Sequence, residues 1–545
     1  MVELEFQQKT KELIDSLKGI CANYGLGNDG NEFKIITQVF LYKFLNDKFA
    51  FEAKKLDKKI ANSEKWEEEL TSMTEDELEM LQLQMGADTA RLKPAHFISY
   101  LFSQQNKSDF AKLFDDTLRD IAITNNDVFA VKTDGGAKVV LFDRLSEYIA
   151  DDSKRDAFCR AIINKLIEFS FERIFTQKFD FYATIFEYLI KDYNSNSGGK
   201  YAEYFTPHAV ARIMAEILVP QAQRGVVKNV SCYDPSAGSG TLLMNVAHAI
   251  GENRCSIYTQ DISQKSSNLL RLNLILNNLV HSIPNVIQGN TVLHPYHKDG
   301  SELKHFDYIV SNPPFKLDFS DFRDDLDTKE NKDRFFAGIP TIPKKKKEGM
   351  AIYQLFLQHI ISSLKPGGKA AVVVPTGFIT AQNGVDPKIR KKLIDEKLLA
   401  GVVSMPSNIF ATTGTNVSIL FIDDSYKGNV ILIDASNLGK KVKDGKNQKT
   451  LLSLEEEQQI IDVFNKKLEQ EDFSVIVEHK NIASKNYSLS AGQYFDVKIE
   501  YTDITPDEFT SKINNFGESL KDLFDKSHDL EKRIKNELER LSYEK

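Results

Sequence analysis

The sequence predicts an α/β protein: a doubly wound sheet, preceded by a helical region and followed by one long amphipathic helix. From about residue 226 onward, short apolar runs alternate with helical patterns, which is typical of a sheet with crossover helices. Residues 1 to about 170 show instead a helical period in their apolar residues. The tail from residue 508 spaces its apolar residues mostly four and three apart, as coiled-coil helices do.

The strands and helices of the α/β region follow from these patterns. The predicted strands are residues 226–233, 255–260, 286–288, 308–311, 370–375 and 401–405. The predicted helices between them are residues 241–250, 266–279 and 352–364. Two further apolar runs, residues 417–422 and 429–433, are separated by a short turn-forming segment, and they predict an antiparallel hairpin at the edge of the sheet.

The composition limits the class of protein. With 545 residues, 41% of them hydrophobic, the chain is long enough for roughly three or four domains. No apolar run reaches the roughly 18 residues of a membrane span, and the N-terminus lacks the apolar core of a signal peptide. The four cysteines lie far apart without a Cys-x-x-Cys spacing. We therefore expect a cytoplasmic protein without a membrane segment, a disulfide framework or a metal site.

The first candidate site is the run Asp234-Pro235-Ser236-Ala237-Gly238-Ser239-Gly240, which follows a predicted strand and precedes a predicted helix. Glycines at such a turn let the backbone bend tightly and approach a ligand closely. The run is not a P-loop, because no Gly-Lys-Ser/Thr ends it. Taken alone, it is also compatible with an ordinary strand–loop–helix turn or a loop that binds a nucleotide phosphate.

The second candidate site is Asp261 with its neighbour Ile262. Asp261 ends the next strand, about 20 residues after the glycine-containing run, where nucleotide-binding sheets hold a ribose. Ile262 could pack on an adenine ring. The alternative is an aspartate that caps the helix beginning near Ser263.

The third candidate site is Asn312-Pro313-Pro314-Phe315, directly after the predicted strand 308–311. Because prolines cannot continue a central strand, the strand breaks there and leaves Asn312 and the Pro313 carbonyl at the carboxyl edge of the sheet. Two acceptors aimed at one planar amino group favour a pyramidal nitrogen whose lone pair is free to attack. Phe315 supplies a flat face for an extruded base. The alternative is a turn with a buried phenylalanine.

The fourth candidate site lies upstream, in Tyr204-Phe205-Thr206-Pro207. Alone, a Thr-Pro pair before the helical pattern of residues 208–218 is a plain N-cap with proline in the first turn. The order and spacing of the four sites carry more information than any one of them. Together they resemble the gamma-class amino-methyltransferases, and in particular the DNA methyltransferase (modification) subunits of type I restriction–modification systems, over roughly residues 175–495.

This resemblance implies a Rossmann-like sheet of the class I methyltransferases that use S-adenosylmethionine. It also implies four regions along the chain. These are an N-terminal helical domain (residues 1–170), a catalytic domain (171–436), a connecting region (437–500) and a C-terminal helix that docks a partner subunit (501–545). Methyl transfer would be direct: the N6 nitrogen of adenine attacks the sulfonium methyl in line and takes it from the sulfur. No cysteine in the motif suggests the covalent route of carbon-5 methylation.

The resemblance also assigns roles to residues. Tyr204, Phe205, Thr206, Pro207 and the loop from Asp234 to Gly240 would hold the methionine part of S-adenosylmethionine, and Asp261 its ribose. Asn312, Pro313, Pro314 and Phe315 would handle the target adenine. The family usually has an aspartate after a glycine to bind the cofactor's adenine amino group. Here Asn290 follows Gly289, and its side-chain carbonyl could still accept a hydrogen bond.

The expected partners are DNA and other subunits. A net charge of −8 is unusual for a protein that grips DNA alone, because duplex DNA attracts basic surface. About 75 residues separate the predicted hairpin from the tail helix, too few for a target-recognition domain. The resemblance implies a separate specificity subunit, with two modification subunits for each one, and a restriction nuclease subunit as a further candidate. The lysine run 344–347 would contact phosphate or remain solvated surface.

Four alternatives stay open on sequence alone. A protein glutamine methyltransferase uses the same Asn-Pro-Pro acceptors, usually followed by tyrosine. A solitary DNA adenine methyltransferase would carry its own sequence recognition. A cytosine amino-methyltransferase more often has serine in place of Asn312. A catalytically inert assembly scaffold would have no reason to keep an acceptor pair beside a cofactor loop.

Overall fold

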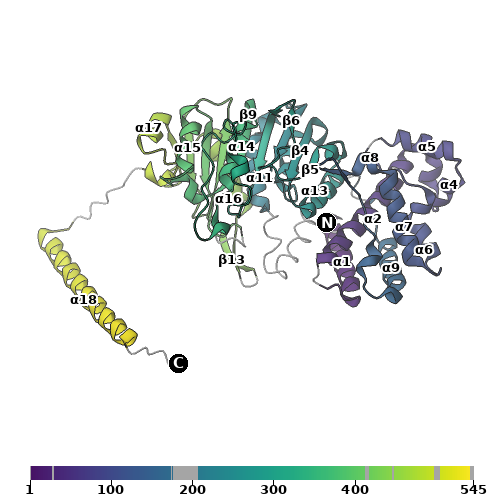
Figure 1. The fold of residues 1–545 in the computed structure, drawn as a ribbon, viewed down its shortest axis with the longest axis horizontal. Coiled ribbons are helices and arrows are strands. Elements are labelled where there is room, and N and C mark those ends of the chain that lie inside the picture. The colour runs from purple at the N-terminus through teal and green to yellow at the C-terminus, as the bar shows by residue number, and fades with distance from the viewer. Residues whose placement is uncertain are drawn as a thin grey trace. The chain divides into compact units, whose positions relative to one another are not determined.

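The computed structural model describes residues 2–27, 30–86, 88–172, 175, 206–410, 416–444, 447–495 and 504–539 (Figure 1). The chain divides into two compact units, Met1–Tyr494 and Phe495–Lys545. The finer division into four regions at residues 170, 436 and 500 stays a prediction. None of the described helices combines the length and the apolar character that crossing a membrane requires. All four cysteines are free and buried.

The N-terminal region is mostly helical, as its apolar period predicts. Its helices are α1 (Val2–Asn23), α2 (Gly30–Leu56), α3 (Lys58–Asn62), α4 (Trp66–Ser72), α5 (Glu75–Gln84), α6 (Ile98–Gln104), α7 (Phe110–Thr124), α8 (Asn126–Phe129) and α9 (Asp152–Ile167). Helix α2 is central, because it buries side chains all around its circumference, including the ion pair of Lys43 and Asp47 at 2.9 Å. A buried charge pair of this kind requires close mutual contact to offset its lost hydration.

The main sheet has eleven strands among the described residues, in the order β15-β12-β10-β11-β9-β8-β3-β4-β5-β1-β2. Its strands are β1 (Val131–Thr133), β2 (Lys138–Val139), β3 (Val230–Asp234), β4 (Cys255–Asp261), β5 (Val286–Gln288), β8 (Phe306–Ser311), β9 (Leu364–Pro375), β10 (Leu399–Ser404), β11 (Val417–Asp423), β12 (Val430–Asp434) and β15 (Ser474–Val477). The central strands from β9 to β1 run parallel to one another. Two small hairpins lie apart: β6 (Lys298–Asp299) with β7 (Glu302–Leu303), and β13 (Lys440–Asp444) with β14 (Asn447–Leu451).

The antiparallel hairpin predicted from residues 417–422 and 429–433 is wrong. Strand β11 lies antiparallel between β9 and β10, whereas β12 pairs in parallel with β10, so β10 separates the two runs. The physical reason is burial: residues 417–422 are all buried and uncharged, which suits a central strand with neighbours on both sides. An edge strand would expose one row of backbone groups and would normally carry charge there.

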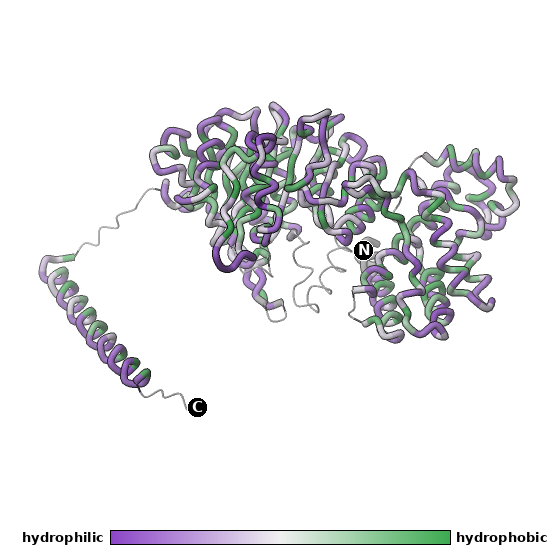
Figure 2. Tube along the Cα trace, viewed as in Figure 1, coloured by the Kyte–Doolittle hydropathy of each residue, from purple (hydrophilic) through white to green (hydrophobic). Residues whose placement is uncertain are grey.

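The N-terminal region also contributes a hairpin that the helical reading of residues 1–170 missed. Strand β1 pairs in parallel with β5, and β2 closes the sheet as an antiparallel edge strand. The N-terminal region and the α/β region therefore share one sheet as well as one continuous apolar core. Figure 2 shows hydrophobic residues concentrated along the strands of this unit.

The helices of the α/β region cover the sheet and support the loops at its edge. They are α11 (His208–Leu218), α12 (Thr241–Ile250), α13 (Gln264–Leu276), α14 (Tyr353–Ser362), α15 (Asp386–Asp395), α16 (Leu454–Lys466) and α17 (His479–Ser484). Helix α11 packs on α12 and α16, and α13 packs on α2. A second apolar cluster, which includes Val292, Phe319, Phe335 and Leu355, lies under the long segment between β8 and α14.

The second unit contains helix α18 (Pro506–Glu539), which confirms the amphipathic tail helix. All its described side chains are exposed, and its apolar positions are each more than half exposed. The predicted stripe positions that the structure describes are Phe509, Ile513, Phe516, Leu520, Leu523, Leu530, Ile534 and Leu538, and Leu541 lies outside the described residues. No described residue of this unit covers the stripe.

Candidate active site

The candidate residues gather at the carboxyl edge of the sheet because four neighbouring parallel strands end there. Strands β8, β3, β4 and β5 are adjacent in the sheet and run in one direction. Their last residues lead directly into Asn312, the loop 234–240, Asp261 and the Gly289-Asn290 pair. Such an edge is where open α/β sheets bind ligands.

The loop after β3 has the backbone that its glycines predict. Gly238 and Gly240 have φ angles of 53° and 84°, in the left-handed region. A Cβ at Gly240 would lie 2.2 Å from Cδ1 of Leu270 on α13, so a side chain does not fit there. Helix α12 begins at Thr241, directly after this turn. Gly240 therefore lets the loop pack closely on α13.

Neighbouring elements hold this loop in place. The hydroxyls of Ser236 and Ser311 lie 2.8 Å apart, which ties the loop to the end of β8. Thr291 donates its hydroxyl to the carbonyl of Pro235 at 2.7 Å, and the amide of Asn273 donates to the carbonyl of Ser239 at 2.7 Å. The loop is thus bonded to elements on both sides of it.

Asp234 is almost completely buried at the start of the loop, with 1% of its surface exposed. One of its oxygens accepts the N–H of Ser236 at 2.9 Å. Burial raises the pKa of Asp234 to about 7, although its hydrogen bonds to Ser236 and Ser311 act in the opposite direction. Its charge therefore changes near neutral pH, and a cation placed against it would favour the ionised form.

Asp261 bridges the loop and the start of α13. Its carboxylate accepts the N–H of Gly238 at 3.0 Å and that of Ser263 at 2.8 Å. Burial raises its pKa, and the two N–H groups partly offset that effect. The helix cap is Ser263, whose hydroxyl accepts the N–H of Ser266, so Asp261 is not the capping residue. Its remaining lone pairs are available for a ligand hydroxyl, and the neighbouring Ile262 is 68% exposed.

Asn312 and Thr206 meet across the edge. The amide nitrogen of Asn312 donates to the hydroxyl of Thr206 at 3.3 Å, which leaves the amide oxygen as an acceptor. The N-cap position of α11 belongs to Pro207, and Thr206 precedes it. The predicted upstream segment is thus in contact with the third candidate site. Tyr204 and Phe205 lie outside the described residues.

Phe315 is half-buried and rests against an aromatic neighbour that sequence reasoning missed. Its ring meets that of Tyr353 edge-on, with centroids 6.5 Å apart and planes at 83°. The hydroxyl of Tyr353 donates to the carboxylate of Asp386, with both oxygens at 2.8 Å. Between Asn312 and Phe315, Pro313 is buried and Pro314 is exposed. Nothing in the local spacing of Tyr353 relates it to Phe315, because α14 brings it from almost 40 residues away.

Asn290 caps its own turn in the structure. Its side-chain oxygen accepts the N–H groups of Val292 and Leu293, both at 3.1 Å. Opposite Gly289, the sheet places Asp134 from the β1–β2 turn, which is a second residue that sequence reasoning missed. The run Asp134-Gly135-Gly136 between two β-branched segments is a hairpin signal that could have located it.

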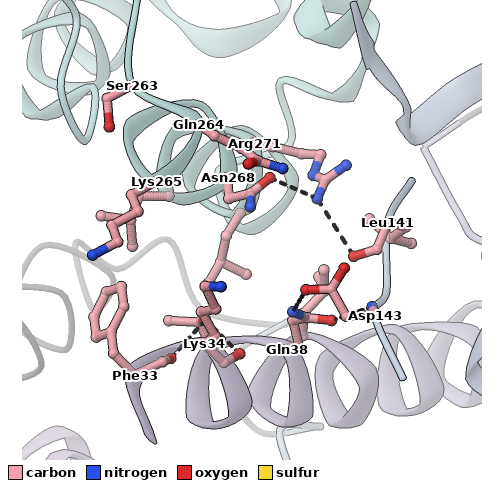
Figure 3. Close-up of a pocket in the computed structure, with 14 residues that line it drawn as sticks. Phe33, Lys34, Gln38, Leu141, Asp143, Ser263, Gln264, Lys265, Asn268 and Arg271 are labelled. Atoms are coloured by element: carbon pink, nitrogen blue, oxygen red, sulfur yellow. Dashed lines mark hydrogen bonds between the residues drawn. The ribbon is translucent and has the colours of Figure 1, made fainter. Parts of the chain in front are cut away.

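A cavity of about 390 Å³ lies between α2 and α13 (Figure 3). Gln38 and Asp143 bond each other through side chain and backbone at 2.9 and 2.7 Å, and Arg271 donates to the carbonyl of Leu141 at 3.4 Å. The residues that line the cavity come from the N-terminal region and from α13, with Ser263 at the start of that helix. We assign this cavity to the seam between the two regions, since none of the candidate residues at the carboxyl edge lines it.

Comparison with known proteins bears on this geometry. The chain is 31% identical over 368 residues to the methylase subunit of the type I restriction enzyme MpnII of Mycoplasma pneumoniae, covering 66% of this chain and 63% of that protein. It is 30% identical to the methylase subunit of the type I restriction enzyme MjaIX of Methanocaldococcus jannaschii, covering 70% of this chain and 67% of that protein.

A solved structure shares the fold. The methyltransferase subunit of a type I restriction–modification system from Streptococcus thermophilus superimposes with a TM-score of 0.71 at 20% identity, covering 90% of this chain and 100% of that one. The sequence profile described as N-6 DNA methylase matches residues 177–503, which include all four candidate sites. The chain therefore belongs to the N-6 DNA methylase family.

Proposed function

We propose that this chain transfers a methyl group from S-adenosylmethionine to the N6 amino group of adenine in double-stranded DNA. It does so as the modification subunit of a multi-subunit restriction–modification enzyme, in which a separate specificity subunit recognises the sequence. The observation that carries the proposal is the placement of Asn312 and Phe315 at the end of β8, beside a glycine loop to which that strand is bonded through Ser236 and Ser311. The named relatives support the same assignment.

The residues of the edge fit S-adenosylmethionine. The Asp234 carboxyl suits an amino-acid ammonium group, and the lone pairs of Asp261 suit ribose hydroxyls. Thr206 and Pro207 would complete the methionine end. When bound, the cofactor supplies a methyl group that its sulfonium charge makes electrophilic.

The chain's own residues would do the rest through positioning. The Asn312 oxygen and the Pro313 carbonyl accept the two hydrogens of the adenine amino group, which favours a nucleophilic nitrogen. Phe315 stacks on the extruded base and holds it in the plane that those acceptors require. Because the hydrogen bond that the Asn312 amide donates to Thr206 orients that amide, the acceptor oxygen is set before the base arrives.

The test is base-modification mapping of genomic DNA from the native host, which supplies whatever partners the chain needs. Wild type is compared with Asn312→Ala at the chromosomal locus. Asn277→Ala is the matched control, since its amide bonds the carbonyl of Asn273 at the far end of α13. We expect adenine in one DNA sequence motif to lose its methyl group in Asn312→Ala and to keep it in Asn277→Ala. Unchanged adenine marks in Asn312→Ala would overturn the proposal and favour protein glutamine methylation or a scaffold.

The tail helix is the proposed contact with the specificity subunit. Its apolar stripe is exposed along the whole of α18, and a helical seam is the partner surface that such a stripe fits. The double variant Leu523→Asp, Leu530→Asp places two charges on the stripe. The control Asn514→Asp, Asn536→Asp places two charges on the opposite face, at 100° per residue.

We expect the stripe variant to lose co-purification with the specificity subunit and to keep its cofactor affinity. The control should keep both. Co-purification that survives the stripe variant would place the interface elsewhere. The same proposal includes two modification subunits for each specificity subunit and a nuclease partner. It also includes phosphate contact by the exposed lysines 344–347.

A further inference from the structure

Asp134 reaches the carboxyl edge because β1 joins the sheet in parallel. Lys132 and Thr133 of β1 are in register with Ile287 and Gln288 of β5, so the residues that follow the two strands come side by side. The N–H of Asp134 donates to the carbonyl of Gln288 at 2.9 Å, which fixes the start of the β1–β2 turn on the end of β5. A residue of the N-terminal region therefore stands in the row of candidate side chains.

The carboxylate of Asp134 lies directly over Gly289. A Cβ built on Gly289 would lie 2.6 Å from Oδ2, 2.7 Å from Cβ and 2.8 Å from Cγ of Asp134. The φ angle of Gly289 is not positive, so its backbone conformation does not require glycine. What requires glycine there is the side chain of Asp134. That side chain is exposed and has no hydrogen bond or ion pair with the described part of the chain.

The order of the strands says which part of a ligand would meet Asp134. Along the sheet, β3 is followed by β4, β5 and β1. A nucleoside whose amino-acid end lies at the loop after β3, and whose ribose lies at Asp261, directs its base toward β5 and β1. Ile262 offers an exposed apolar face there. The side-chain oxygen of Asn290 is already occupied by two backbone N–H groups.

We infer that Asp134 accepts a hydrogen bond from the exocyclic amino group of the cofactor's adenine, so that the N-terminal region completes the cofactor site. A carboxylate selects an amino group at this position and repels a carbonyl, which presents a second acceptor. The inference rests on the proposed function, because it assumes the ligand to be an adenosyl amino acid.

The test measures the affinity of the full chain for two ligands by titration calorimetry. One is S-adenosylhomocysteine, and the other is S-inosylhomocysteine, in which an oxo group replaces the amino group. In Asp134→Ala we expect binding of the adenosyl ligand to weaken about tenfold. Binding of the inosyl ligand should stay the same or improve. The control Asp127→Ala removes an equal charge from the same region, where Asp127 pairs with Lys138 of β2 at 2.8 Å, and it should leave both affinities unchanged.

A second variant approaches the contact from the other side. Gly289→Ala displaces the Asp134 carboxylate and should lower selectivity for the adenosyl ligand as Asp134→Ala does, with no further loss in the double variant. Unchanged selectivity in Asp134→Ala, or equal loss of both ligands, would overturn the inference and leave the proposed function standing. A wild-type chain that binds neither ligand would overturn both.

Discussion

The two halves of the carboxyl edge differ in how firmly they are held. The loop after β3 is bonded to β8 through Ser236, to the segment after β5 through Pro235, and to α13 through Ser239. Among the described residues, the run Asn312–Phe315 has one side-chain hydrogen bond, from Asn312 to Thr206 at 3.3 Å, and a half-buried Phe315 that touches Tyr353 edge-on. We call the loop 234–240 the cofactor half and the run 312–315 the target half. The cofactor half is fixed, and the target half is more loosely held.

This difference matches the two ligands in the proposed reaction. A fixed loop binds a small cofactor with little further ordering, and ordering always costs affinity. An extruded base brings its own flat surface and two donor hydrogens, so the target half can be completed by the substrate. We therefore expect substitutions in the target half to affect methyl transfer and substitutions in the cofactor half to affect cofactor binding.

After Asn312→Ala, the largest effect should come from Phe315→Ala, which removes the stacking face from the target half. Stacking of a base on an aromatic side chain is worth about 1–3 kcal/mol, so we expect methylation of duplex DNA to slow by up to about 100-fold. Cofactor affinity should stay within about twofold of wild type, and Phe315→Tyr should restore most of the rate. A parallel loss of cofactor affinity would show that the two halves are not separate.

Gly240→Ala should break the cofactor half. The substitution puts a Cβ against Leu270 and forces alanine to a φ of 84°, so we expect cofactor affinity to fall about tenfold and stability to fall by about 1–2 kcal/mol. Gly251→Ala is the control, because Gly251 has a φ of 110° at the other end of α12. It should cost similar stability in thermal unfolding and leave cofactor affinity unchanged. Equal affinity losses in both would mean that the loop itself is not the binding element.

A smaller effect should appear in the pH dependence of cofactor binding. Since burial raises the pKa of Asp234 to about 7, its carboxyl is mostly neutral at pH 6.5 and mostly ionised at pH 7.5. We expect affinity for the cationic amino-acid end of S-adenosylmethionine to rise about threefold over that interval. Asp234→Asn should remove the dependence. His297, whose pKa burial lowers to about 4, stays neutral throughout and cannot cause it.

The raised pKa of Asp234 also affects folding stability. Stability should fall as the pH rises, whereas cofactor affinity should rise. A carboxyl that ionises near pH 7 when folded and near pH 4 when unfolded binds more protons in the folded state between those values. Its contribution to stability is therefore full below about pH 4 and is lost as the pH rises through 7. Chemical unfolding of the ligand-free chain, compared with Asp234→Asn, separates this effect from cofactor binding.

The sequence was a good guide where local order and spatial order agree. The glycine loop, Asp261 and Asn312 each follow a strand whose neighbours in the parallel sheet also bear candidate residues, so reading strand ends in turn placed them together. It failed where a strand pairs out of turn. The run 417–422 inserts between β9 and β10. Its lack of charge is a local signal for a central strand, but it does not say which strands flank it.

Asp134 is a second residue whose place in the site the sequence did not predict. Strand β1 has three residues, and it lies within a region whose apolar period is helical, so its pairing with β5 is visible only in the folded chain. Tyr353 is a similar case, because packing of α14 rather than spacing brings it to Phe315. Long-range contacts of this kind depend on how whole elements pack, which a local pattern does not encode.

The smallest effect should come from Tyr353→Phe, which asks whether Phe315 needs support beyond ring contact. The variant keeps the edge-on ring and removes the hydroxyl that donates to Asp386, whose carboxylate still accepts from Gln354 at 2.6 Å. We expect methylation to slow by about twofold and stability to fall by about 1 kcal/mol. Tyr148→Phe, which loses an exposed hydroxyl bond to Asp143 at 3.1 Å, should leave the methylation rate unchanged. A tenfold slower rate in Tyr353→Phe would mean that the target half is held more firmly than the described bond between Asn312 and Thr206 indicates. The contact between Tyr353 and Asp386 would then fix Phe315 before the base arrives.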